Sequence, residues 1–321
     1  MSSSRVCKNR RKKQDNRLLK MKRQFFLKRM NRQVRHFFAF ISVYLLVFFI
    51  KFFPFWFIRY AGNIIGTVLH IFSVKHKNII EQNLSLVSKA SCLSPDKKVI
   101  SKKVFISSSR IALENLWLSQ KPVFVRRKII SLTGIEYVQS ALSKGKGAII
   151  VTGHFSNFAL IPAFFSMEGF KVSVLVRPLR YNMLNSLYKR MCQKYGFNLI
   201  FTIPKRQCIS DCIKALNLNQ IVCILADQNV GKKGIITNFF QLQTYTMQTP
   251  FLISLRTGSA ILPAFVSGHN GHYQIQVLPC FEILKVEDIK DVAQKFTSLL
   301  EERIRGGFHQ WMWAYRRWNG G

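Results

Sequence analysis

A histidine in the middle of the chain follows a short apolar segment, at a position suited to chemistry. Residues 148–152 are small or β-branched and predict a buried strand, and residues 157–167 carry apolar side chains at helical spacing. His154 is therefore expected on the turn at the carboxyl end of a strand, the edge where open α/β sheets bind ligands. An imidazole there suits general base catalysis. A lone histidine is also compatible with a purely structural role.

The elements around this turn alternate between strand and helix patterns. Strands are predicted at 172–176, 199–203, 221–226, 260–266 and 273–278, and helices at 97–118, 135–143, 184–195, 207–218, 249–258 and 286–304. This alternation predicts an α/β fold, with a mostly parallel central sheet flanked by helices on both faces. Ser94 is expected to cap the helix at 97–118, with Pro95 in its first turn.

The N-terminal part of the chain differs in composition from the rest. Residues 1–35 hold 14 basic side chains and a single acidic one, and predict a basic tail. Residues 36–72 are largely apolar and predict a membrane anchor, a single transmembrane or re-entrant segment plus an interfacial helix. A buried helical hairpin of a soluble protein is the alternative. Residues 73–321 are then expected to form the catalytic domain.

Within this anchor, the run Phe37–Ile58 contains one charge, Lys51, and is about long enough to cross a bilayer. Pro54 would permit a kinked or re-entrant insertion. Basic residues flank the run on both sides, so the distribution of charge does not fix its orientation.

The chain is strongly basic, with 49 Lys and Arg against 14 Asp and Glu and a formal charge of +35. Such a surface needs an anionic partner, whether nucleic acid, anionic lipid or an acidic protein. The charge is dispersed and no nucleic-acid-binding module is present, so we expect no nucleic acid partner. The seven cysteines include no C-x-x-C pair, which indicates buried thiols in a reducing compartment and no metal site.

The segment from Gly153 to Phe158 resembles the His-Phe-x-Asn-aromatic-acid block of bacterial lipid A biosynthesis acyltransferases, which have a lysophospholipid acyltransferase-like fold. Four further blocks resemble that family in the same order: Arg177-Pro178 with Asn182 and Arg190; Ala226-Asp227-Gln228 with Asn238-Phe239-Phe240; Thr246 to Pro250 with Thr257-Gly258-Ser259; and Gln310 to Trp318. The resemblance covers roughly residues 37–318.

The resemblance implies acyl transfer from an acyl carrier protein to a hydroxyl of a phosphorylated glycolipid, a lipid A precursor. It further implies no cofactor and a place at the bacterial inner membrane, among its lipids, with the catalytic domain facing the cytoplasm. His154 would be the general base, and Arg177 would hold an acceptor phosphate or stabilise the oxyanion. Further substrate-binding residues would be Asn157, Asn182, Arg190 and Gln228.

One position departs from the family pattern, which has a carboxylate five residues after the histidine, where this chain has Ala159. An introduced substitution, a natural inactive homologue, or a carboxylate supplied from elsewhere would each explain it. Glu168 is too far along the following helix, about 20 Å away. Asp227 ends another strand of the same predicted parallel sheet, so we expect its carboxylate to reach His154.

Two other functions remain open at this point. A catalytically silent membrane protein that binds lipid or carrier protein would retain every feature except turnover. A glycerophospholipid acyltransferase of the same fold is the nearest alternative enzyme.

Overall fold

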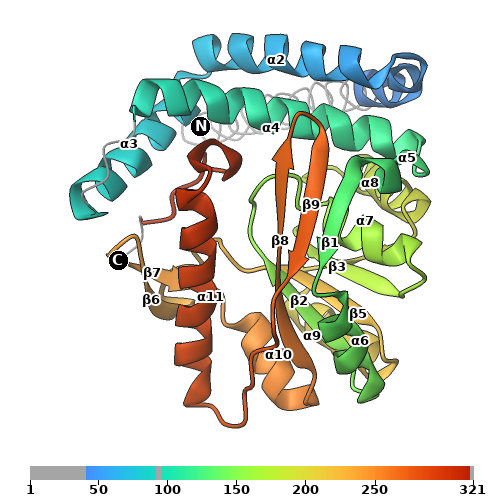
Figure 1. Cartoon of the computed structure of the whole chain (residues 1–321), viewed down its shortest axis with the longest axis vertical. Coiled ribbons are helices and arrows are strands. Elements are labelled where there is room, and N and C mark those ends of the chain that lie inside the picture. The colour runs from blue at the N-terminus through green and yellow to red at the C-terminus, as the bar shows by residue number, and fades with distance from the viewer. Residues whose placement is uncertain (1–40, 92–95, 319–321) are drawn as a thin grey trace, which may run out of the picture.

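The computed structural model describes residues 41–91 and 96–318, with a seven-stranded sheet at the centre (Figure 1). The strands are β1 (Ile129–Thr133), β2 (Ala148–Thr152), β3 (Val172–Val176), β4 (Asn198–Phe201), β5 (Ile221–Leu225), β6 (Ile235–Phe239), β7 (Leu242–Thr246), β8 (Ala260–His269) and β9 (His272–Val277). The helices are α2 (Phe55–Phe72), α3 (Val74–Ser91), α4 (Lys97–Gln120), α5 (Phe124–Lys128), α6 (Ile135–Ser143), α7 (Leu160–Met167), α8 (Asn182–Lys194), α9 (Lys205–Asn217), α10 (Thr249–Thr257) and α11 (Asp288–Arg305), with short 3-10 turns η1 (Ile50–Phe52), η2 (Gly231–Lys233) and η3 (Phe308–Gln310).

The sheet has the strand order β1-β9-β8-β2-β5-β3-β4. Every neighbouring pair in it is parallel except the β8–β9 hairpin. The predicted mostly parallel α/β architecture is thus confirmed. Strand β1 and the separate β6–β7 hairpin were not predicted, because each strand is only five residues long and carries polar side chains.

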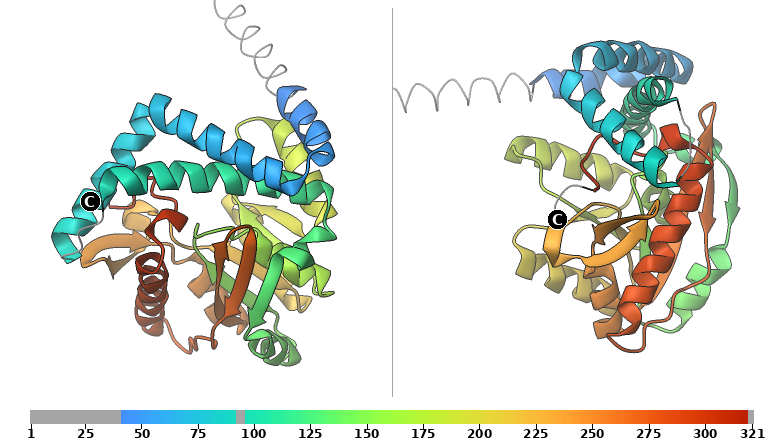
Figure 2. Two further views of the ribbon diagram at one scale, coloured as in Figure 1. Left: turned by 45° about the horizontal axis from the view of Figure 1, so that its top comes forward. Right: turned by 90° about the vertical axis from the view of Figure 1, so that its left-hand side faces the viewer.

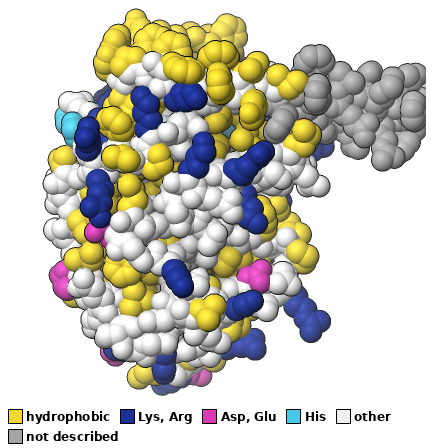
Figure 3. All heavy atoms as spheres, turned by 90° about the vertical axis from the view of Figure 1, so that its right-hand side faces the viewer, with side chains coloured by type: hydrophobic (Ala, Val, Ile, Leu, Met, Phe, Trp, Pro, Cys, Tyr) yellow, Lys and Arg dark blue, Asp and Glu magenta, His cyan; other side chains and the backbone are white. Residues whose placement is uncertain are grey.

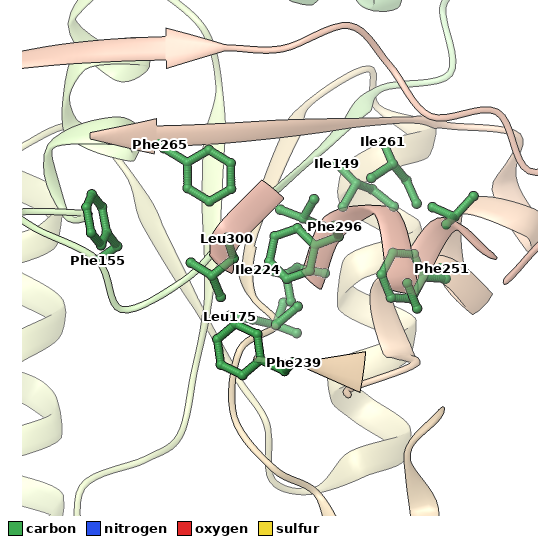
Figure 4. Close-up of a cluster of buried hydrophobic side chains, with 14 of the residues drawn as sticks. Ile149, Phe155, Leu175, Ile224, Phe239, Phe251, Ile261, Phe265, Phe296 and Leu300 are labelled. Carbon is green, nitrogen blue, oxygen red and sulfur yellow. The ribbon is translucent and has the colours of Figure 1, made fainter. Parts of the chain in front are cut away.

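Helices cover both faces of the sheet because alternate residues of its strands are buried on opposite sides. Ile149 and Val151 of β2 pack in a core with α9, α10 and α11, which includes Phe251 and Phe296 (Figure 4). Ala148 and Ile150 pack on the other face in a core with α6, α7 and α8. Strand β2 is buried along its whole length, which matches its nearly continuous apolar sequence.

A layer of long helices lies across one end of this α/β unit, where α2 runs over α4 (Figures 1 and 2). The two helices approach closely because Gly62 and Gly66 face α4. A Cβ at Gly66 would lie 2.5 Å from the Ile106 Cα. Glycines four residues apart allow this kind of close packing between apolar helices.

The opposite side of α2 is exposed and apolar. Figure 3 shows hydrophobic side chains gathered over this end of the molecule, with Lys and Arg beneath them. The exposed large side chains of α2 are Trp56, Tyr60, Ile64, Ile65, Val68, Leu69, Ile71 and Phe72. We call this surface the outer face of α2.

The expected membrane anchor is not confirmed. In the described part of the chain, no single helix is long and apolar enough to span a bilayer, and α2 with α3 meets that criterion only as a pair bent by 88°. The predicted continuous run Phe37–Ile58 is interrupted, because one helical segment ends at Phe52 and Pro54 precedes the start of α2. Residues 1–40, which include the basic tail and the start of this run, lie outside the described residues.

The capping residue of one predicted helix and the start of another differ from the structure. Asp96 caps α4, since its carboxylate accepts hydrogen bonds from the backbone N–H groups of Lys98 and Val99, each at 3.0 Å. Ser94 and Pro95 lie outside the described residues. Helix α7 begins at Leu160, three residues later than expected, because the chain after β2 first forms an irregular turn.

Candidate active site

The turn after β2 brings His154 against Asp227, which follows the neighbouring parallel strand β5. Strand pairing places Thr152 opposite Leu225, and the chain continues on both sides to the same edge of the sheet. The His154 Nδ1 lies 2.7 Å from the Asp227 Oδ1, and the backbone N–H of His154 donates to Oδ2 at 2.8 Å. The expectation that Asp227 reaches His154 is therefore confirmed.

Gly153 makes this close approach possible. A Cβ at this position would lie 3.2 Å from the Asp227 Oδ2 and 2.9 Å from the Leu300 Cδ1 of α11. Both distances are shorter than ordinary van der Waals contact between such atoms. A side chain at residue 153 would therefore press on the carboxylate, on α11, or on both.

The second oxygen of Asp227 is held by the C-terminal segment of the chain. The Trp311 indole N–H donates to Oδ2 at 2.9 Å, and the Tyr315 hydroxyl donates to the same oxygen at 2.6 Å. With the His154 backbone N–H, three donors converge on Oδ2, which leaves Oδ1 for the imidazole. The carboxylate is fully buried, so these hydrogen bonds replace the water it has lost.

These contacts determine the ionisation of the cluster. Burial opposes ionisation of Asp227, but the charge of His154 and the hydrogen bonds from His154 and Tyr315 outweigh it and hold the carboxyl pKa below its usual range. Burial, together with the negative charge of Asp227, holds the pKa of Tyr315 well above its ordinary value. Tyr315 therefore remains a proton donor to an ionised carboxylate at neutral pH.

The C-terminal segment is fixed in place by hydrogen bonds from several elements. The Asn83 amide of α3 donates to the carbonyls of Trp313 and Tyr315, each at 2.9 Å. The buried Arg317 guanidinium donates to the Tyr245 carbonyl at 2.7 Å and to the Thr246 hydroxyl at 2.9 Å in β7. The backbone is therefore held in place on both sides of Tyr315, whose hydroxyl contacts Asp227.

The same segment pairs directly with the turn that carries His154. Phe155 and Trp311 form an antiparallel bridge, the Ser156 N–H donates to the Gln310 carbonyl at 2.7 Å, and the Met312 N–H donates to the His154 carbonyl at 3.1 Å. The backbone that aims the imidazole is therefore held from both strand β2 and the chain terminus.

The imidazole is restrained but not fully enclosed. The rings of Phe158 and Tyr315 contact it edge-on, with ring centroids 5.1 and 5.8 Å away. The His154 side chain retains 17% of its exposure, whereas the Asp227 side chain has none. A neutral imidazole that donates its Nδ1–H to the Asp227 carboxylate has no proton on Nε2. The Nε2 atom is then available as a base.

The remaining predicted site residues occupy different environments. Asn157 is fully buried beside the Tyr273 hydroxyl, and neither of its amide atoms makes a hydrogen bond of standard geometry. The other four are exposed: Arg177 after β3, Asn182 and Arg190 on α8, and Gln228 next to Asp227. Within the described residues no hydrogen bond or ion pair joins these four to His154 or Asp227.

Ala159 lies at the start of α7, and the position that the family pattern fills with a carboxylate has no acid here. The next acid on that helix, Glu168, pairs with Arg126 at 2.9 Å, away from the histidine. Asp227 thus provides the carboxylate at Nδ1. Trp311 and Tyr315 were not predicted as site residues, and the sequence offers only the concentration of aromatic residues with N–H and O–H groups near the C-terminus, which does not show where they dock.

No metal site is found among the residues that the structure describes. No group of three His, Cys, Asp or Glu side chains is placed to hold a metal ion there. Cys208 and Cys212 are buried free thiols on α9, as predicted for the cysteines, whereas Cys280 is exposed.

This fold and site define an α/β protein with a His–Asp pair, its carboxylate buried and its imidazole partly exposed, at the carboxyl edge of a mostly parallel sheet. Residues 24–320 match the sequence profile of the bacterial lipid A biosynthesis acyltransferases, and the chain belongs to that family. The match confirms the resemblance seen in the five sequence blocks.

Curated relatives of the chain carry a related name. It is 21% identical over 189 residues to a phosphatidylinositol mannoside acyltransferase from Mycobacterium tuberculosis (strain CDC 1551 / Oshkosh), over 58% of each chain. A protein of the same name from Mycolicibacterium smegmatis is 20% identical over 151 residues, 47% of this chain and 50% of the relative. The chain therefore spans little more than half the length of the curated relatives it matches.

Proposed function

We propose that the protein transfers a fatty acyl chain from an acyl carrier protein thioester to a hydroxyl of a phosphorylated glycolipid. The observation that carries this proposal is the contact of 2.7 Å between the His154 Nδ1 and the buried Asp227 Oδ1. This contact leaves the other ring nitrogen for proton transfer in a partly open site. Membership of the acyltransferase family supports acyl transfer as the reaction.

In this reaction the acceptor hydroxyl gives its proton to the His154 Nε2 while its oxygen attacks the thioester carbonyl carbon. Asp227 stabilises the imidazolium that forms, as the buried aspartate does in the serine protease triad. The tetrahedral intermediate then collapses, the carbon–sulfur bond breaks, and Nε2 returns its proton to the leaving thiolate. Tyr315 and Trp311 keep Asp227 ionised and oriented throughout.

A lipid A precursor is the acceptor that the family suggests. The relatives are named for phosphatidylinositol mannoside, which likewise carries sugar hydroxyls and a phosphate on a lipid. Both names are consistent with a phosphorylated glycolipid. Arg177 follows β3, which adjoins β5 in the sheet, and is exposed at the same edge. Its guanidinium is suited to hold a phosphate of the acceptor.

The silent homologue is the alternative that Ala159 favours. Its premise is that the histidine lacks a carboxylate partner, and Asp227 supplies one at hydrogen-bond distance. The geometry therefore favours an active enzyme. An acid at residue 159 is not needed to orient the imidazole.

The surface around the site supports the proposal that the protein binds to a membrane. The outer face of α2 exposes aromatic and aliphatic side chains, with Trp56 69% and Phe72 78% exposed. We propose that this face lies in the interface of the bacterial inner membrane, with the catalytic domain on the cytoplasmic side. The formal charge of +35 suits an acidic carrier protein and anionic lipid headgroups.

The test is transfer of a labelled acyl chain from acyl carrier protein to a lipid A precursor in detergent or vesicles. The wild type is compared with His154→Ala and with His272→Ala, which removes an exposed histidine from β9. Activity that is lost in the first variant and retained in the second is the expected result. Transfer to phosphatidylinositol mannoside and not to the lipid A precursor would mean that the acceptor is the mannoside. No transfer to either lipid would refute the proposal.

A further inference from the structure

A polar cavity lies next to the turn that carries His154. Residues of α2, α4, the β8–β9 hairpin and η3 line it, and it has a volume of about 40 Å³. Ser156 lines it, two residues after His154, whereas neither His154 nor Asp227 does. The volume equals about three or four water-sized spheres.

Two arginines line this cavity without full partners. The Arg59 Nη1 makes no hydrogen bond and lies 3.6 Å from the Glu114 Oε1. It lies 2.0 Å from the position that a Cβ of Gly271 would occupy, so a side chain at residue 271 would displace this guanidinium, and Gly271 has the left-handed φ of 78° that favours glycine. Arg110 makes no hydrogen bond or ion pair with any described residue.

One carboxylate, Glu114, also lines the cavity and forms an ion pair with Arg59. The Tyr273 hydroxyl donates to Glu114, which is almost fully buried. Burial raises the pKa of Glu114, against opposing effects from Tyr273, Arg59 and Arg110. Lys128 also lies close enough to interact with this carboxyl group. The cationic groups therefore outnumber the acid.

Two hydroxyls complete the wall of the cavity. Ser107 of α4 and Ser156 line it, and neither hydroxyl donates a hydrogen bond to another described residue. Ser156 has a φ of 50°, a left-handed conformation that is unfavourable for a residue with a side chain. Its Oγ lies 3.1 Å from where a Cβ of Gly268 would stand, so it points toward the hairpin.

We propose that this cavity binds one phosphate group between Arg59 and Arg110, with the hydroxyls of Ser107 and Ser156 as further donors. Guanidinium groups match phosphate oxygens in pairs, and the volume suits a single tetrahedral oxyanion. Arg59 belongs to α2, whose outer face is apolar, so the phosphate comes either from solution or from a lipid headgroup. The inference goes beyond acyl transfer and does not depend on it.

Binding is measured with the full chain in two arms. Isothermal titration with inorganic phosphate tests the free anion, and co-flotation with phosphatidylcholine vesicles, with and without phosphatidic acid, tests the headgroup. Arg110→Gln is compared with Lys102→Gln, an exposed lysine on the same helix about 12 Å away. Arg110→Gln should weaken binding about tenfold in the arm that applies, which corresponds to about 1.4 kcal/mol.

The outcomes separate the two sources. Phosphate binding that falls in Arg110→Gln and persists in Lys102→Gln supports a free anion site. Dependence on phosphatidic acid with the same pattern, and no binding of inorganic phosphate, supports a headgroup. Equal effects of the two substitutions in both arms, or no binding by the wild type, overturn the proposal. If Arg110→Gln does not fold, Arg110→Lys keeps the charge and should still weaken binding through loss of the paired contacts.

Discussion

Replacing Asp227 by asparagine should abolish most of the acyl transfer activity, for a reason that the surrounding donors define. The Asp227 Oδ2 accepts three hydrogen bonds, from the His154 N–H, the Trp311 indole and the Tyr315 hydroxyl. An asparagine NH₂ in that position would face three donors. The amide oxygen must therefore take the place of Oδ2, and the NH₂ group must face the His154 Nδ1.

An NH₂ group at Nδ1 requires that nitrogen to accept a hydrogen bond, which forces the proton of the neutral imidazole onto Nε2. The nitrogen proposed as the base is then occupied. In the serine protease template the same change lowers the rate on the order of 10⁴-fold, or about 5 kcal/mol in the barrier. We expect a loss of similar size, because the carboxylate is fully buried and no water can replace it.

The assay is single-turnover acyl transfer from a labelled thioester, with the wild type and Asp227→Asn both shown to be folded by circular dichroism. Asp291→Asn, which removes an exposed carboxylate from α11, is the matched control and should retain wild-type activity. Activity of Asp227→Asn within tenfold of the wild type would refute the assignment of Asp227 as the partner of the catalytic base.

Three further expectations follow from the same cluster. Tyr315→Phe removes one of three donors to a buried carboxylate and should lower single-turnover transfer about tenfold or more, with the fold retained; unchanged activity would contradict its positioning role. Ala159→Glu should change the rate only a few fold, because Asp227 already contacts Nδ1; a gain of orders of magnitude would show that Asp227 is not sufficient. Because the pKa of Asp227 is lowered in the folded state, its ionised carboxylate stabilises the fold at pH values above the ordinary aspartate pKa of about 3.9. This stabilisation is lost as the pH falls toward the lowered pKa. Denaturant titrations should therefore give a constant stability difference between wild type and Asp227→Asn above about pH 4 and a shrinking one below it, and a difference independent of pH down to acid unfolding would contradict this.

The parts of the site that the sequence predicted were those governed by strand ends. The apolar run 148–152 and the run 221–226 identify two buried strands, and the rule that parallel strands end at one edge brings His154 and Asp227 together. These two short apolar runs were sufficient to predict that the two side chains lie close together. The prediction succeeded because both side chains follow their strands directly.

The donors to Asp227 were beyond such reasoning. Trp311 and Tyr315 belong to a segment without regular structure, which contacts the site through an isolated bridge at Phe155. Its course depends on side chains far away in sequence, such as Asn83 of α3. Propensity and periodicity describe local preferences, so they do not specify where an irregular segment docks.

The absence of an acid at residue 159 shows that a site can be complete although one residue of the sequence motif is missing. The chemistry requires a carboxylate oxygen within hydrogen-bond distance of Nδ1 and a fixed orientation for it, whichever element supplies the oxygen. A side chain at residue 159 would approach from a partly exposed helix start, whereas Asp227 approaches from a strand end where burial and three donors fix it. Because preorganisation of such groups determines their electrostatic effect, the strand carboxylate is the better placed of the two, and Ala159 is compatible with the role proposed for the His154–Asp227 pair.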